Sequence, residues 1–125
     1  MGKEVAVEGC TIEDTTGGGT VTIDSDPSEK VLADGSKVYF GPLSFSVSGS
    51  DGGGKIGDGN GQGSGTIDGT GTNICDADGN PAILVGDKVT ITVNGTTTSG
   101  SSTTSSSGDI TVEITDAGQA KVIAL

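Results

Sequence analysis

The chain of 125 residues contains no histidine, no arginine and no tryptophan. Imidazole is a standard ligand of zinc, and histidine is the usual general base in nucleophilic catalysis. No motif places a lysine or a carboxylate beside Cys10, Cys75 or a serine to take over that role. We therefore expect no enzymatic activity and no bound cofactor.

Large side chains are also scarce. The aromatic residues are Tyr39, Phe40 and Phe45, whereas glycine occurs 24 times. A chain of this kind buries little apolar area per residue, while glycine raises the entropy cost of folding. We therefore expect a homo-oligomer, in which the region of these aromatic residues lies in the core or at a subunit contact.

Positive charge is also scarce. The chain has six lysines and seventeen carboxylates, so the net charge is −11. Without a basic cluster or an aromatic platform, neither nucleic acid nor an anionic membrane is an expected partner. The longest apolar runs fall well short of the roughly 20 residues of a membrane-spanning helix. No apolar segment follows Met1, so we expect synthesis in the cytoplasm without a signal peptide.

Two cysteines, Cys10 and Cys75, are too few for a disulfide framework. Both lie in strand-like runs, where cysteine commonly acts as a small hydrophobic residue. We expect buried free thiols, with a disulfide between the two as the open alternative.

A degenerate internal repeat is the clearest positive feature. Residues 33–41 (ADGSKVYFG) return as residues 77–86 (ADGNPAILVG), and residues 43–49 (LSFSVSG) return as 89–95 (VTITVNG). Asp78 follows Asp34 by 44 residues, and Gly95 follows Gly49 by 46. The repeat predicts two copies of a turn-strand-turn-strand unit.

Apolar and polar residues alternate with a period of two over residues 4–8, 20–24, 43–47, 89–93 and 110–114. Shorter apolar runs cover residues 31–32, 37–40, 74–75, 82–85 and 121–123. Helical spacing is not seen. We predict one all-β domain over residues 1–125, a small sandwich or barrel of about nine to eleven short strands.

Two long segments interrupt these runs. The glycine-rich segment 49–71 is expected to be a mobile loop or a set of tight turns. The Ser/Thr-rich segment 94–109 has no large apolar residue and is expected to be an exposed loop that joins two strands of a hairpin.

Carboxylates at Asp76 and Asp78 flank the start of a glycine turn, in the manner of a calcium loop, and Asp87 and Asp58 complete the candidate ligands. The competing interpretation is an Asx turn between two strands. An ordinary calcium loop ends in glutamate, and the twelfth residue from Asp76 is Asp87. The turn is the preferred interpretation.

Residues 61–67 (GQGSGTI) and 77–89 (ADGNPAILVGDKV) resemble small glycine-rich β proteins of phages and prophages. The segment 78–87 (DGNPAILVGD) is also similar to the turn-strand-turn unit of PAAR-type spike-tip proteins. That family holds a tip metal with histidines and a cysteine, so the resemblance carries no metal site over to a chain without histidine. It implies a structural or assembly component of a phage particle or a phage-derived injection apparatus, which associates with itself and with other structural proteins and ends up in a virion-like assembly. The alternative is a small calcium-dependent binding or adhesion module.

Overall fold

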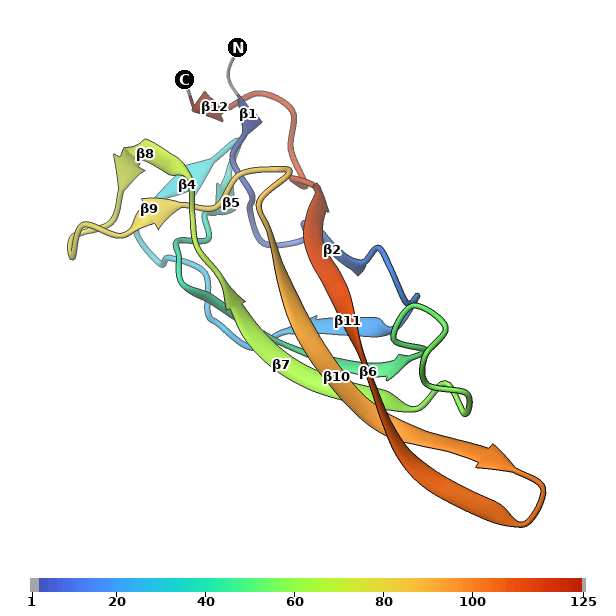
Figure 1. Ribbon diagram of the computed structural model, residues 1–125. Helices are drawn as coiled ribbons and strands as arrows, with labels where there is room; N and C mark the ends of the chain where they lie inside the picture. The colour runs from blue at the N-terminus through green and yellow to red at the C-terminus, as the bar shows by residue number, and fades with distance from the viewer. Residues whose placement is uncertain (1–2, 125) are drawn as a thin grey trace.

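The computed structural model describes residues 3–124, and within them all regular structure is β, as predicted. One antiparallel sheet of six strands dominates (Figure 1). Its strand order is β2 (Thr11–Asp14), β11 (Ser102–Asp116), β10 (Lys88–Ser99), β7 (Gly61–Ile67), β6 (Leu43–Ser50) and β3 (Thr20–Ile23). The sheet curls until it nearly closes into a barrel.

Three short strand pairs lie at the end of the molecule that carries both termini (Figure 1). They are β1 (Lys3–Glu4) with β12 (Ile123–Ala124), β4 (Leu32–Ala33) with β5 (Ser36–Lys37), and β8 (Gly71–Cys75) with β9 (Pro81–Ala82). The turn between β4 and β5 is the Asp34-Gly35 pair, whose φ angles of 52° and 81° are those of a type I′ hairpin turn.

Strand alternation separates an apolar interior from a hydroxyl-rich exterior. Along β6, Leu43, Phe45 and Val47 are buried, while the serines between them face outward. The same alternation in β10 and β11 directs Val93, Ile110 and other apolar side chains inward. Period-two patterning therefore predicted these strands correctly.

The expectation of a loop over residues 49–71 is wrong for residues 61–67, because these form β7 between β6 and β10. Gly61, Gly63 and Gly65 face inward, where a Cβ on Gly61 would lie 2.7 Å from Ile56 Cδ1 and one on Gly65 2.8 Å from Ile91 Cγ2. Glycine in β7 leaves room for the large side chains of neighbouring strands to fill the interior. The residues 51–60 that precede β7 do form turns.

The expectation of a loop over residues 94–109 is also wrong. The ladder between β10 and β11 continues without interruption from Lys88↔Glu113 to Ser99↔Ser102. Only Gly100 and Ser101 form the turn, and Gly100 has a φ of 62°, as required at the first central position of a type II′ turn. The Ser/Thr tract is therefore the outer half of a long two-stranded hairpin.

The two repeat copies meet in a ring of backbone hydrogen bonds. Tyr39 N donates to Ala6 O at 3.0 Å, Ala6 N to Ile83 O at 2.8 Å, and Ile83 N to Tyr39 O at 3.0 Å. Tyr39 and Ile83 occupy equivalent repeat positions, and Ala6 supplies a third segment that the repeat did not predict. We expected strands over residues 38–40 and 82–85. In the structure these segments form mostly isolated β-bridges around the ring.

This ring divides the interior into two apolar clusters. The central residues Ala6, Tyr39 and Ile83 belong to the main cluster inside the barrel. Their neighbours, among them Val5 and Leu84, belong to a second cluster beneath the short strand pairs. One side of each segment thus packs into the interior of the barrel, and the other side packs beneath the short strand pairs at the end that carries the termini.

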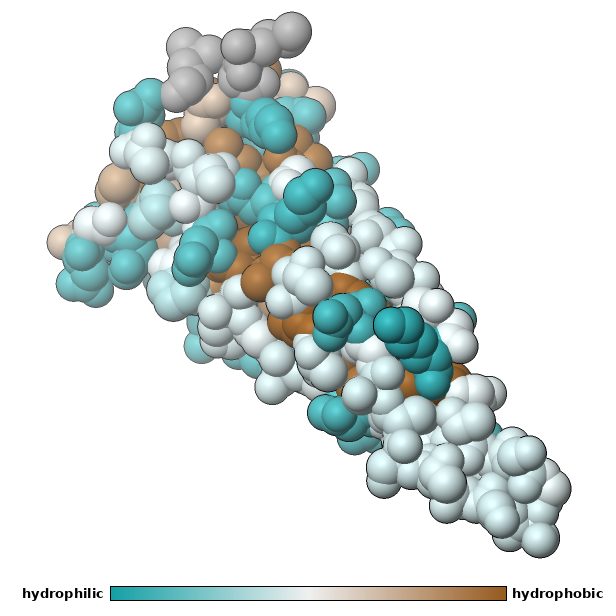
Figure 2. Space-filling model, in the orientation of Figure 1, coloured by the Kyte–Doolittle hydropathy of each residue, from teal (hydrophilic) through white to brown (hydrophobic). Residues whose placement is uncertain are grey.

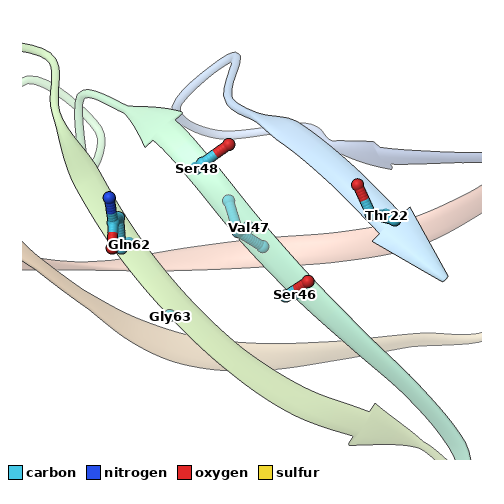
Figure 3. Close-up of a pocket in the computed structure, with 6 residues that line it drawn as sticks. All are labelled: Thr22, Ser46, Val47, Ser48, Gln62 and Gly63. Carbon is cyan, nitrogen blue, oxygen red and sulfur yellow. The ribbon is translucent and has the colours of Figure 1, made fainter. Parts of the chain in front are cut away.

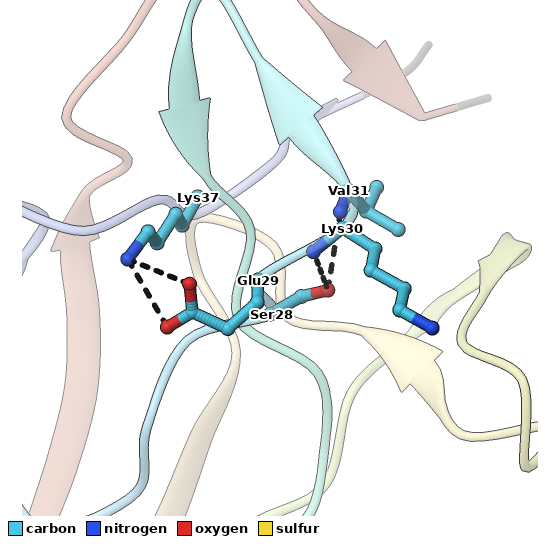
Figure 4. A network of polar contacts seen from close by, with 5 residues as sticks. All are labelled: Ser28, Glu29, Lys30, Val31 and Lys37. Atoms are coloured by element: carbon cyan, nitrogen blue, oxygen red, sulfur yellow. Dashed lines mark hydrogen bonds and ion pairs between the residues drawn. The ribbon is translucent and has the colours of Figure 1, made fainter.

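Val31 packs against this second cluster, and a polar network holds residues 28–31 in place (Figure 4). The Ser28 hydroxyl accepts hydrogen bonds from the amides of Lys30 and Val31, both at 3.2 Å. Lys37 Nζ lies 3.1 Å from Glu29 Oε2 and donates to Oε1 at the same distance. Ser28 N also donates to Val38 O at 2.8 Å, and Val38 N donates to Val31 O at 3.0 Å, so backbone and side-chain contacts together fix a segment that has no strand of its own.

Candidate assembly interface

The outer half of the β10–β11 hairpin, residues 96–107, projects beyond the barrel as a two-stranded ribbon (Figure 1). We call it the ribbon. Hydroxyl contacts join its strands: Thr97 Oγ1 donates to Ser106 Oγ at 3.0 Å, and the Thr98 and Thr103 hydroxyls lie 3.1 Å apart. A two-stranded ribbon without an apolar face is marginally stable in water. Its stability therefore depends on what its two backbone edges bind.

The β10 edge of the ribbon is capped by the turn before β7. Asp58 accepts hydrogen bonds from the Thr96 hydroxyl at 2.7 Å, the Thr98 hydroxyl at 2.8 Å and the Thr98 amide at 3.1 Å. Asn60 Oδ1 accepts from the Thr96 amide at 2.9 Å. The hydroxyl bonds from Thr96 and Thr98 hold the pKa of Asp58 below its ordinary value. Side chains thus satisfy donors that a neighbouring strand would otherwise bind.

The β11 edge of the ribbon has no such cap. At the base of β11, the Thr111 amide donates to Thr16 Oγ1 at 3.1 Å, and the Thr111 carbonyl accepts from Thr15 at 2.9 Å. The period of two directs the backbone groups of Thr103, Ser105 and Ser107 to this same side. Within residues 3–124, no hydrogen bond joins those outward backbone groups to another part of the chain.

The ribbon's own residues carry no charge, and the one carboxylate described against it, that of Asp58, lies at its β10 edge. No charged residue lies between Lys88 and Asp109, in a chain whose net charge is −11. Figure 2 shows the projecting end as an evenly pale surface, while the strongly hydrophilic and hydrophobic residues gather on the body. The ribbon is therefore where two copies can approach with the least repulsion.

A shallow hollow of about 460 Å³ lies on the outer face of β3, β6 and β7 (Figure 3). Its lining consists of Thr22, Ser46, Val47, Ser48, Gln62 and Gly63. It lies beside the interruption of the β6–β7 ladder between Val47 and Ser50. Hydroxyl and amide groups line this hollow, and no charged side chain does.

The proposed calcium ligands are not brought together. Asp76 and Asp78 belong to the β8–β9 turn, where Asp76 Oδ1 accepts from the amides of Asp78 and Asn80, both at 2.9 Å. This is the Asx turn of the competing interpretation, and hydrogen bonds from Asn80 keep the pKa of Asp76 low. No cluster of three or more acidic or cysteine side chains within residues 3–124 could hold a metal ion.

Asp87 and Asp58 likewise act as acceptors for the chain's own donors. The buried Asp87 binds the Thr70 hydroxyl at 2.5 Å, the Thr70 amide at 3.1 Å and the Leu84 amide at 2.8 Å. Asp58 caps the ribbon, as described above. These carboxylates therefore hold turns against strands.

Sequence reasoning missed Asp14, which is the most completely enclosed of the carboxylates that hold turns. The Asp14 side chain accepts from the amides of Thr16, Gly17 and Gly19 at 3.0, 2.6 and 3.0 Å, and from Ser50 Oγ at 2.7 Å. Burial acts to raise its pKa, but the hydrogen bonds from Gly17 and the other donors outweigh burial and lower it. The glycine run after Thr16 was the available signal, since a wrapped carboxylate needs closely approaching amides.

The aromatic residues and the cysteines separate into interior and surface positions. Tyr39 and Phe45 lie in the main cluster, and Phe40 packs against the second one. Both cysteines are free thiols, but the expectation of burial is wrong for Cys75, which is exposed in β8. Burial raises the pKa of the half-buried Cys10 to about 11.

These observations define a small, nearly closed β-barrel with a projecting, uncharged ribbon. Comparisons with protein-family models, with curated proteins and with solved structures find no match to this chain. Residues 3–124 include no helix that is long and apolar enough to cross a membrane.

Proposed function

We propose that this protein is a non-enzymatic structural component that works by self-association, as part of a phage particle or a phage-derived injection apparatus. The observation that carries the proposal is the ribbon, an ordered pair of strands that extends past the apolar core with one backbone edge free. A free edge without charge, proline or a bulge is what natural proteins avoid unless the edge is used for pairing.

Two further features support this role. The enclosed carboxylates Asp14 and Asp87 fix loops to strands, which suits a rigid part. The resemblance of residues 78–87 to spike-tip units supplies the phage context. The calcium-dependent module is the weaker alternative, because the oxygens of Asp58 and Asp76 already accept hydrogen bonds from the chain.

The phage context can be tested in cells that produce the protein. Particles are induced, banded by density and examined by mass spectrometry and immunogold microscopy. The proposal predicts that the chain is enriched in the particle band and labels a discrete part of the particle. Recovery only from particle-free soluble fractions would contradict it.

A further inference from the structure

We propose that the ribbon pairs with the ribbon of a second copy of this chain, through the β11 edge, around a two-fold axis at Ser105. This inference rests on the proposed self-association and names the surface that performs it. The free backbone groups belong to Thr103, Ser105 and Ser107, and Ser105 is the middle one. A Cβ placed on Gly53 would lie 3.9 Å from the Asp109 carbonyl oxygen, so the turn that holds Gly53 covers the β11 edge beyond Ser107.

An antiparallel two-fold at Ser105 satisfies every outward backbone group of this edge. Ser105 pairs with Ser105 of the other copy, and Thr103 pairs with Ser107 in both directions, so each pair exchanges two N–H···O=C bonds. The four strands then form one continuous sheet. Three or more strands are what an isolated ribbon needs for stability of its own.

Electrostatics favours a second copy in this arrangement. Antiparallel pairing makes the two ribbons overlap while their acidic bodies lie at opposite ends, so the charges stay far apart. The overlapping segments contain no charged residue. The β10 edge is excluded as the contact, because Asp58 and Asn60 occupy its donors at Thr96 and Thr98.

Disulfide trapping tests the register, with Cys75→Ser as the background because Cys75 is exposed. Ser105→Cys places two thiols opposite each other, with Cα atoms about 5.5 Å apart, within the range that a disulfide spans. Thr103→Cys and Ser107→Cys are matched controls on the same exposed face. In each control chain the equivalent residues of the two copies are offset by about 14 Å along the strands, at about 3.4 Å per residue.

We expect Ser105→Cys to form a covalent dimer under mild oxidation, while each control alone stays monomeric on a non-reducing gel. Mixing the two control chains should give a covalent heterodimer, because Thr103 of one copy faces Ser107 of the other. Equal cross-linking by all three single variants, or none by Ser105→Cys and by the mixture, would overturn the inference.

Sedimentation of Ser105→Pro gives an independent measurement. Proline at this position removes an outward N–H and leaves the β10–β11 ladder intact, so the circular dichroism spectrum should be unchanged. The dimer dissociation constant should rise about tenfold or more, whereas Ser105→Thr should leave it unchanged. If the wild type associates and Ser105→Pro associates equally well, the edge is not the interface and self-association stands. If the wild type is a monomer at low and at high salt, both proposals fail.

Discussion

The Ile83 amide donates a 3.0 Å hydrogen bond to the Tyr39 carbonyl, and the two residues hold equivalent positions in the two repeat copies. Both side chains enter the main apolar cluster. The repeat therefore brings its two copies into direct contact at the boundary between the two apolar clusters.

Truncation of Ile83 should weaken the fold as a whole. Ile83→Ala removes a fully buried side chain from this junction and should lower the free energy of unfolding by about 2–5 kcal/mol, measured by urea denaturation. Ile123→Ala is the matched control, since Ile123 is 50% exposed. A loss from Ile83→Ala no larger than that from the control would contradict a stabilising role of the ring.

Asp14 should make stability depend on acid pH. Its lowered folded pKa means that its contribution is present above the unfolded value of about 4 and is lost as the pH falls through the folded pKa. Asp14→Asn should cost about 1–3 kcal/mol at neutral pH and should flatten the acid limb of the stability curve. Asp78→Asn is the control, because Asp78 is exposed. An acid limb in Asp14→Asn as steep as in the wild type would show that other groups cause the dependence.

The two thiols should differ in reactivity toward a disulfide reagent. Cys75 is exposed, whereas burial raises the pKa of Cys10 from 9.0 to about 11, which reduces its thiolate fraction about a hundredfold. At pH 8 the Cys75 thiol should react quickly, and the Cys10 thiol should react only after denaturation. Cys75→Ser should remove the fast phase, and a fast phase that survives this change would contradict the assignment.

The sequence predicted the strands that carry apolar residues on one face, such as β6 and the base of β10. It failed at β7 because the inward residues are glycines, so that Gly61, Gly63 and Gly65 alternate with polar residues and give no apolar signal. It failed at the ribbon because both faces carry hydroxyls, which hides the period of two. A glycine at every second position was the available signal for β7, and the β-branched threonines were the signal for the ribbon.

The candidate site was less predictable than the fold. Asp58 was singled out as a calcium ligand, yet its role depends on Thr96 and Thr98, which lie about 40 residues further along the chain. Long-range pairing of this kind is set by strand register, and local patterns do not reveal it. The Asx turn at Asp76 was predictable because all of its partners lie within four residues.

Calcium should have no effect on stability. A ligand at a hundredfold excess over its dissociation constant adds about 2.7 kcal/mol to the native state, which a thermal melt detects easily. We expect equal melting temperatures with calcium and with chelator, because Asp76 and Asp87 already hold the chain's own donors. A melting temperature that drops with chelator and recovers with calcium would favour the binding-module alternative.

Self-association at two ionic strengths tests the central claim most directly. At tens of micromolar protein, sedimentation is compared in about 10 mM and about 500 mM salt, because screening reduces the repulsion between bodies of net charge −11. The account predicts a dimer whose population rises with salt. A monomer at both salt concentrations would contradict it.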